Sequence, residues 1–346
     1  MITTRDIAEH LQLSVSTVGR ALADDHRISE QTKFRVRQAA AEMGYVANRA
    51  ARMMRGAASN VVGLVIPDIR NSFYSTIAHE LSKDMETQGF QLILSETDDD
   101  RMVELRHLRE LSASRVAGII IVPTARPHSE SGKLLQTIPH VQLLRKHSSL
   151  GAQWFGVDDF EAMRQATTHL VEQGHTRIGY VGGSAELPTG AERLKGFRSA
   201  LSEGHLPSRA SRIELGPPSS IEHGRQAVRR LLTARSAPTA IALGSIQLTL
   251  GTLEELHRMG VRVPGDLSVV GFGDEPGFSW WGPGLTTIGL PIQAVAAGCG
   301  LWLMRRLSTK PDDDTPYTSV SPGALIVRGS TAPPANVRRP PRRKGS

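Results

Sequence analysis

The chain has 346 residues, too many for one small domain, and a formal net charge of +7, which suits a polyanionic partner. Its single cysteine, Cys299, excludes an intramolecular disulfide and with it a secreted disulfide scaffold. The apolar runs are too short to span a bilayer and no export signal precedes the first expected helix, so we expect a cytoplasmic protein without a membrane partner.

Most of the positive charge lies near the two ends of the chain. Residues 1–55 hold nine Lys and Arg against six Asp and Glu, a net charge of +3, and residues 335–346 hold five basic residues and no acidic ones. Residues 332–346 are rich in Pro and Arg and have no apolar periodicity, so we expect a disordered basic tail. A solubilising role for this tail is favoured over an additional contact to nucleic-acid phosphates.

Residues 1–47 predict three short helices. Thr4 is the expected N-cap of the first helix, Ser14 of the second, and Ser29 of the third, which runs to about Met43. Gly44 follows as a left-handed stop. Apolar residues recur at helical spacing and should close one small core, made of Ile7, Ala8, Leu11, Val18, Ala21, Leu22, Val36, Ala40 and Met43.

The second helix leaves one face free of the core. Val15, Ser16, Thr17 and Arg20 lie on that face near the helix start. A helix-turn-helix protein presents side chains to base edges in the major groove from this position. The three helices therefore predict a reader of double-stranded DNA.

The order of residues in this head resembles the LacI/GalR (lactose-repressor type) family of bacterial transcriptional regulators. The residues in step with the family pattern are Asp6, Ile7, Ala8, Ser14, Thr17, Val18, Arg20, Gly44, Tyr45, Asn48, Ala51 and Arg52. Gln12 stands where the family turns on Gly, so it must adopt a left-handed conformation or reshape the turn. Gly19 replaces a Ser within the second helix, which lowers its helix propensity, and Ala47 replaces a hinge Pro.

The resemblance implies which residues contact DNA. Val15, Ser16 and Arg20 match base-reading positions, and Arg20 is suited to a bidentate contact with guanine. Residues 48–55 resemble a hinge that lies in the minor groove, where Met54 takes the place of an intercalating Leu; packing of Met53 and Met54 against the core is the less favoured alternative. The expected contacts are Thr4, Ser14, Val15, Ser16, Thr17, Arg20, Asn48, Arg52, Met54 and Arg55.

From residue 60 the pattern alternates between short apolar strands and amphipathic helices, which predicts parallel sheets covered on both faces. Strands are expected at 60–67, 89–96, 118–123, 140–144, 177–183, 212–215, 239–244, 267–273 and 324–329. Helices are expected at 73–88, 102–112, 161–173, 191–203, 221–233, 247–259 and 292–307. The alternation runs through two similar halves without a short identical repeat.

This region also resembles the family, whose core is similar to sugar-binding proteins of the periplasm. The implied fold class is α/β, with an all-α helix-turn-helix head and a core of two flavodoxin-like parallel-sheet subdomains. We expect the head at 1–47, a hinge helix and linker at 48–59, and a ligand-binding core at 60–331. Subdomain 1 comprises 60–157 and 293–320, and subdomain 2 comprises 160–288 and 323–331, with crossings near 157–160, 288–293 and 320–323. Ligand binds in the cleft at the strand ends and closes it.

The resemblance places the ligand site at Asn71, Phe73, Tyr74, Arg145, Thr189, Arg193, Ser245, Ile246 and Gly273. Ile246 and Gly273 stand where sugar-responsive members carry Asp, whereas arginine is suited to capture of a carboxylate or phosphate. We therefore expect a positive cleft and an anionic effector, which is a sugar acid, a keto acid or a sugar phosphate. The alternative is an apolar pocket in which Arg145 and Arg193 pair with nearby acidic residues, namely Asp158, Asp159 or Asp274.

We do not expect an enzyme. The sequence has no phosphate-binding loop, nucleophile elbow or metal-binding histidine spacing, and residues 98–100 are expected in a solvated loop, so we expect no cofactor, metal or catalysis. The predicted function is ligand-responsive transcriptional regulation, with repression by a homodimer on a pseudo-palindromic operator. The alternative is a small-molecule binding protein of the periplasmic type without DNA regulation, and the missing phosphate loop argues against a doubly wound nucleotide enzyme.

Overall fold

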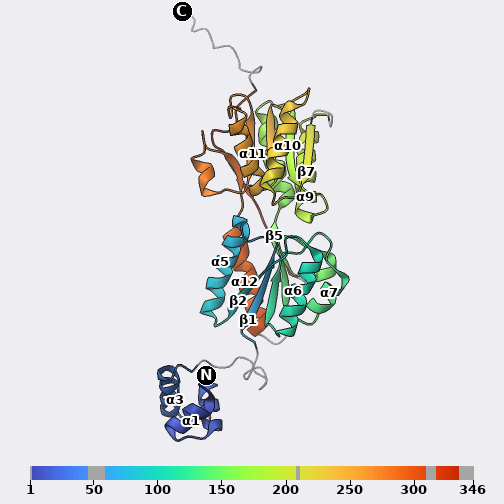
Figure 1. Cartoon of the computed structure of the whole chain (residues 1–346). Helices are drawn as coiled ribbons and strands as arrows, with labels where there is room; N and C mark the ends of the chain where they lie inside the picture. The colour runs from blue at the N-terminus through green and yellow to red at the C-terminus, as the bar shows by residue number, and fades with distance from the viewer. Residues whose placement is uncertain (1, 46–58, 208–210, 309–316, 335–346) are drawn as a thin grey trace, which may run out of the picture. The chain divides into compact units, whose positions relative to one another are not determined.

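The structure is a computed structural model that describes residues 2–45, 59–207, 211–308 and 317–334. The chain divides into two compact units, Met1–Ser59 and Asn60–Ser346, called the head and the core below (Figure 1). Each unit is described by itself.

The head contains the three expected helices, α1 (Thr4–Leu11), α2 (Val15–Leu22) and α3 (Glu30–Glu42). Their core is centred on side chains with no exposed surface, Ile7, Val18, Ala21 and Val36. The predicted N-caps of α2 and α3 are confirmed, because the side chain of Ser14 accepts a hydrogen bond from the Thr17 amide and that of Ser29 from the Thr32 amide.

The predicted N-cap of α1 is wrong by one residue. Thr3, not Thr4, caps this helix, and its hydroxyl accepts from the Asp6 amide while the Asp6 carboxylate accepts from the Thr3 amide at 2.6 Å. This reciprocal capping box needs an acidic or amide side chain three residues after the cap, and Asp6 stands at that distance from Thr3. Thr4 is the first residue of the helix itself.

Gln12 adopts the left-handed conformation after α1, with φ 53° and ψ 42°, as one of the two expected solutions for this turn. Because a side chain is disfavoured there, Gln12→Gly should stabilise the head by about 1 kcal/mol. Hydrogen exchange of the Ile7 and Val18 amides in the whole chain measures this gain. Gln38→Gly, within the exposed face of α3, should lower the stability of the head by about the same amount. A change of stability in the same direction for both variants would contradict the left-handed conformation of Gln12.

The core contains two six-stranded sheets. Sheet A is parallel, with strand order β11-β5-β4-β3-β1-β2, and sheet B has the order β12-β10-β9-β8-β6-β7 with only β12 antiparallel to its neighbour. The strands of sheet A are β1 (Val61–Ile66), β2 (Gln91–Glu96), β3 (Gly118–Ile121), β4 (His140–Leu143), β5 (Trp154–Val157) and β11 (Thr318–Ser321). The strands of sheet B are β6 (Ile178–Gly183), β7 (Ser211–Gly216), β8 (Ala240–Leu243), β9 (Ser268–Phe272), β10 (Thr286–Gly289) and β12 (Ala324–Ile326).

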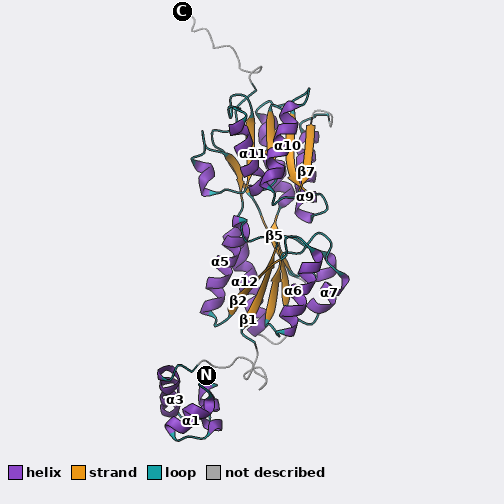
Figure 2. Cartoon of the chain, viewed as in Figure 1, coloured by secondary structure: helices purple, strands orange, loops and turns teal. Residues whose placement is uncertain are grey.

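Helices cover both faces of each sheet (Figure 2). Sheet A is covered on one face by α5 (Ser72–Thr87) and α12 (Ile292–Ser308), and on the other by α6 (Arg101–Ala113) and α7 (Ser129–Leu135). Sheet B is covered on one face by α8 (Asp159–Glu172) and α9 (Pro188–Glu203), and on the other by α10 (Ile221–Thr233) and α11 (Ile246–Arg258). Two short 3-10 helices lie at Ser148–Leu150 and Pro276–Ser279.

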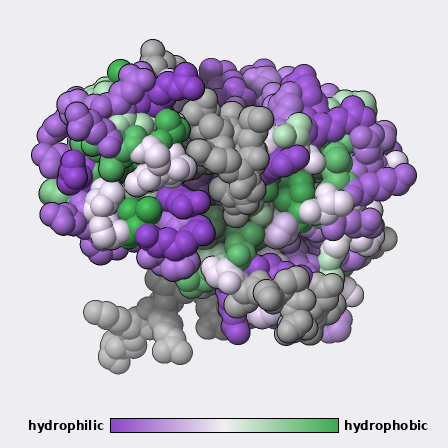
Figure 3. Space-filling view, turned by 90° about the horizontal axis from the view of Figure 1, so that it is seen from below, coloured by the Kyte–Doolittle hydropathy of each residue, from purple (hydrophilic) through white to green (hydrophobic). Residues whose placement is uncertain are grey.

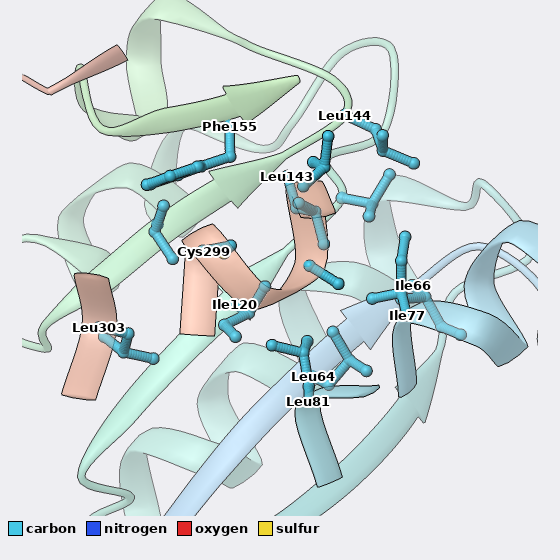
Figure 4. Packing of buried hydrophobic residues seen from close by; sticks show 14 of the residues in the cluster. Leu64, Ile66, Ile77, Leu81, Ile120, Leu143, Leu144, Phe155, Cys299 and Leu303 are labelled. Atoms are coloured by element: carbon cyan, nitrogen blue, oxygen red, sulfur yellow. The ribbon is translucent and has the colours of Figure 1, made fainter. Parts of the chain in front are cut away.

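The alternation of side chains along the central strand β1 divides its residues between two apolar clusters. Leu64 and Ile66 pack with Leu81 of α5 and Cys299 of α12, whereas Val65 belongs to the cluster on the opposite face (Figure 4). Cys299 is fully buried, and burial raises the pKa of its thiol, so this side chain packs in the core as a small apolar group.

The chain passes between the two sheets three times, after β5, after β10 and after β11. The strands β5, β10 and β11, and the helix α7, were not among the predicted elements. No helix in the described ranges combines the length and apolar character needed to cross a bilayer. On the face drawn in Figure 3, hydrophobic residues form separate areas among hydrophilic ones.

Candidate nucleic-acid interface and ligand cavity

The second helix of the head separates a buried side from an exposed side. Val18 and Ala21 have no exposed surface, whereas Val15 is 47% exposed, and Ser16 and Arg20 are exposed. In the described part of the chain, Arg20 has no ion-pair partner, so its guanidinium is available to an external acceptor. A large apolar residue and an arginine on one solvent-facing helix surface are suited to contact thymine methyl groups and guanine edges.

Hydroxyl groups at the start of α2 form one connected group. The Ser14 hydroxyl lies 2.8 Å from the Ser16 hydroxyl and 2.7 Å from the Thr17 hydroxyl, and it also caps the helix. Thr17 is therefore held by the cap. The predicted DNA contacts Asn48, Arg52, Met54 and Arg55 lie outside the described residues.

The core contains a cavity lined by loops that follow the carboxyl ends of strands in both sheets. Eight of the nine predicted ligand residues line it: Asn71, Phe73, Tyr74, Arg145, Thr189, Arg193, Ser245 and Ile246. Asn71 caps α5 and Ser245 caps α11, so the N-termini of two helices face this cavity. Converging helix N-termini favour ligands with hydrogen-bond acceptors.

The ninth predicted residue, Gly273, does not line the cavity. It has φ 83°, and a Cβ atom placed on it would lie 2.5 Å from Cγ1 of Ile246 and 3.0 Å from Cζ of Phe73. The absence of a side chain at Gly273 therefore allows the two lining residues to pack closely. A direct ligand contact by this residue is not supported.

Arg193 of α9 forms a nearly enclosed ion pair. Its Nε and Nη2 atoms lie 2.7 Å from Oδ1 of Asp159, and its Nη1 donates to the Gly244 carbonyl at 2.7 Å. Its guanidinium carbon also lies 3.9 Å from the centre of the Phe272 ring. Burial raises the pKa of Asp159, and the nearby Arg193 opposes this rise.

Arg145, after β4, forms a second ion pair in the same cavity. Its guanidinium donates to the carboxylate of Asp99, after β2, and to the Pro123 carbonyl at 3.2 Å. The Arg145 side chain is 5% exposed and that of Asp99 is 26% exposed. Tyr74 is buried beside this pair, and burial raises the pKa of its phenol.

The expected positive cleft is therefore wrong, because two arginines and two aspartates line the cavity. The acidic side chains expected from the family are absent at Ile246 and Gly273, but Asp99 and Asp159 bring carboxylates from other strand ends. The predicted alternative of an Arg193–Asp159 pair is present, whereas Arg145 pairs with a residue outside the predicted set.

The acidic run at residues 98–100 is not wholly a solvated loop, contrary to the sequence expectation. Asp98 is exposed, Asp99 lines the cavity, and Asp100 caps α6 by accepting from the Met102 amide at 2.6 Å. The position of the run directly after a strand was the available signal for the role of Asp99. In the described residues no group of three His, Cys, Asp or Glu side chains is arranged to hold a metal ion.

Two family models match the sequence. The model described as "Bacterial regulatory proteins, lacI family" matches residues 3–48, and that described as "Periplasmic binding protein-like domain" matches residues 167–331. The match to the head argues against the alternative of a binding protein without DNA regulation.

Similar curated proteins cover nearly the whole chain. The HTH-type transcriptional regulator DegA of Bacillus subtilis (strain 168) is 30% identical over 335 residues, which span 96% of this chain and 98% of that protein. The ribose operon repressor of Halalkalibacterium halodurans is 30% identical over 331 residues, which span 96% of this chain and 97% of that protein.

Solved structures share the fold over the same length. A Lac repressor dimer bound to operator and the anti-inducer ONPF has a TM-score of 0.83 at 23% identity, covering 96% of this chain and 99% of that chain. A complex of the transcriptional regulator CelR with cellobiose has a TM-score of 0.72 at 25% identity, covering 96% and 100%. The chain therefore belongs to the lacI family of bacterial regulatory proteins, and it is a ligand-responsive, DNA-binding transcriptional regulator and not an enzyme.

Proposed function

We propose that two copies of this protein bind a pseudo-palindromic operator, with α2 of each head in the major groove, and repress by occupying it. The exposure of Val15, Ser16 and Arg20 opposite the buried Val18 and Ala21 is the observation that carries this proposal. Thr4, Ser14 and Thr17 would contact the DNA sugar-phosphate backbone or position it next to this surface. Cytoplasmic DNA is the expected partner.

Within these two units, we assign the helix-turn-helix to 1–47, the hinge to 48–59, the ligand-binding region to 60–331 and the basic tail to 332–346. In this proposal Asn48, Arg52, Met54 and Arg55 contact the minor groove, with Met54 inserted between base pairs. Effector binding changes the closure of the core and with it the separation of the two hinges, so effector and operator affinities are reciprocally coupled.

A binding series with double-stranded fragments of the source genome tests this function. The purified full chain should select a small set of fragments with two related half-sites, and its affinity should fall as the salt concentration rises. Equal binding to all fragments at every salt concentration, with and without metabolite mixtures, would contradict sequence-specific regulation.

An exposed apolar surface on the core supports the proposed homodimer. Leu250, Leu253 and His257 of α11, with Phe278, Trp280 and Trp281, line a groove on its surface. Trp280 is 77% exposed, although burial of a tryptophan gives a large hydrophobic gain. We propose that a second copy of the chain covers this groove.

Replacing Trp280 with aspartate should raise the dimer dissociation constant roughly 30-fold or more, because a charge would replace a large apolar contact. Sedimentation velocity over a concentration series measures this change. Leu301→Asp is the control, since Leu301 is 68% exposed on α12, away from the groove residues. Unchanged self-association of the Trp280 variant would exclude this groove as the interface.

We propose further that the effector is a small anion, such as a sugar acid, keto acid or sugar phosphate. Arg145 and Arg193 support this proposal, because guanidinium groups bind carboxylates and phosphates with two hydrogen bonds. Both arginines are already paired with aspartates, so an anion must replace a carboxylate in at least one pair.

The two aspartates favour a second candidate, a neutral polyhydroxylated ligand. A sugar hydroxyl both donates and accepts, so it can bridge an arginine and an aspartate without displacing either. Calorimetric titration of matched pairs separates the candidates: galactose with galacturonate, and glucose with gluconate and glucose 6-phosphate. Binding of the charged member alone supports the anionic effector, and binding of the neutral member alone contradicts it.

A further inference from the structure

The two ion pairs of the cavity differ in how firmly their carboxylates are held. Asp159 begins α8, is only 7% exposed, and accepts from Nε of Arg193, whose Nη2 also lies 2.7 Å from the same carboxylate oxygen. Asp99 is 26% exposed and lies in a connecting loop, while its partner Arg145 is 5% exposed and cannot turn out to solvent without leaving its contact with the Pro123 carbonyl. The exchangeable member of the four charges is therefore the Asp99 carboxylate.

The loop that carries Asp99 has an unusual backbone. Asp98 and Asp99 both have positive φ, 49° and 59°, and Asp100 begins the capping of α6 directly afterwards. Side chains are disfavoured in this left-handed region, although aspartate tolerates it better than most residues. Two consecutive residues in this conformation turn the chain sharply between β2 and α6 and bring the Asp99 carboxylate to the cavity.

We propose that Asp99 determines the charge class of ligand that this cavity accepts, by occupying on Arg145 the position that the carboxylate or phosphate of an anionic ligand would take. The inference rests on the proposed effector cavity and names a residue outside the set predicted from the family. An anion in the cavity competes with a tethered carboxylate, whose local concentration is high because the loop holds it in place. Removal of the Asp99 charge therefore opens an anion site around Arg145.

The Asp99–Arg145 pair is also connected to other segments of subdomain 1. Arg145 joins the ends of three segments, because it follows β4, bonds to Pro123 after β3, and pairs with Asp99 after β2. Thr124, which follows Pro123 in the chain, donates its amide hydrogen to the buried carboxylate of Glu104 on α6 at 2.8 Å. Movement of Asp99 away from Arg145 would therefore change the contacts at the start of α6.

Anion-dependent thermal unfolding of the full chain tests the proposal without a known effector. Asp99→Asn removes the charge, keeps the side-chain size and suits a left-handed backbone, so the turn is preserved. Asp98→Asn is the matched control, since Asp98 has the same backbone conformation in the same loop but is exposed and does not line the cavity. Acetate and inorganic phosphate are the probes, compared with chloride at equal ionic strength.

In chloride, Asp99→Asn should unfold several degrees below the wild type, because the buried Arg145 guanidinium loses its counter-charge. Acetate or phosphate should raise its Tm by roughly 5 °C or more beyond the rise seen in the wild type and in Asp98→Asn. The comparison between variants removes the general stabilisation by these salts. An equal response of all three proteins would overturn the proposal.

The double variant Asp99→Asn/Arg145→Gln keeps the test informative if the single variant folds poorly. It should unfold above Asp99→Asn in chloride and show no special response to acetate, since the site for the anion is gone. An acetate response that survives in the double variant would overturn the assignment to Arg145.

Titration of galacturonate, gluconate and glucose 6-phosphate into Asp99→Asn gives the second measurement. Affinity for at least one of them should increase about tenfold or more over the wild type, and a decrease or no change in all three overturns the proposal. Neither measurement uses DNA, so failure to find an operator would count against the proposed function and leave this inference standing.

Discussion

Replacing Arg20 with alanine should weaken binding to the preferred operator by about 1–3 kcal/mol, or roughly 5- to 150-fold, and should leave binding to random DNA nearly unchanged. Arg20 is exposed at the solvent face of α2 and lies one turn from Val15 and Ser16. Its fork of donors can contact the O6 and N7 atoms of guanine together, which no other base pair edge offers in the same geometry. Loss of this contact should therefore lower the preference for the operator over random DNA more than it lowers the general attraction to DNA.

Fluorescence anisotropy with an operator fragment and a scrambled fragment measures the two affinities. Arg20→Lys should keep most of the non-specific affinity and lose most of the preference, because a lysine ammonium cannot make the paired contact. Arg35→Ala is the matched control, since Arg35 is an exposed arginine of α3 in the same head. If Arg35→Ala and Arg20→Ala reduce the operator preference equally, Arg20 does not read a base.

The largest stability effect is expected at Arg193. Arg193→Met keeps a similar length of apolar side chain but leaves the carboxylate of Asp159 buried without its partner and the Gly244 carbonyl without one donor. Breaking one side of a buried ion pair costs about 3–5 kcal/mol, far more than loss of a surface pair. Urea unfolding followed by the core tryptophans should show this loss, whereas Arg198→Met, at an exposed position of the same helix, should change stability little.

The loss should depend on pH with a definite sign. The folded-state pKa of Asp159 lies above its ordinary value of 3.8 because of burial, and Arg193 is the group that opposes this rise. Without Arg193, the folded protein retains a proton that the unfolded chain releases above about pH 4, so the stability of the variant falls as pH rises. The variant should therefore lie closer to the wild type at pH 5 than at pH 8. A difference that is constant with pH would mean that Asp159 is not the source of the loss.

The head was predictable because its determinants are local. Ser14 and Ser29 cap helices through amides three residues away, and the core positions of α1 and α2 recur at helical spacing. The one error, Thr4 in place of Thr3, arose because two adjacent threonines can both begin a helix. Only the reciprocal contact with Asp6 distinguishes them.

The position of the cavity was also predictable, since its residues follow apolar runs that form parallel strands. Asn71, Arg145 and Ser245 each come after such a strand, and the carboxyl ends of parallel strands lie at one edge of a sheet. Its charge was not predictable by the same reasoning. Resemblance to the family directed attention to the positions of Ile246 and Gly273, whereas the carboxylates of this chain come from Asp99 and Asp159.

By itself, the sequence determined the three-helix head, the alternating strands and helices of the core, and the membership in the regulator family, because these depend on periods and motifs within short stretches. Only the tertiary structure decided how the cavity is charged. Arg145 and Asp99 are 46 residues apart, and Arg193 and Asp159 are 34 apart, so each pair forms only once its segments are brought together in the folded core. Such distant pairing depends on three-dimensional packing, which local residue patterns do not encode.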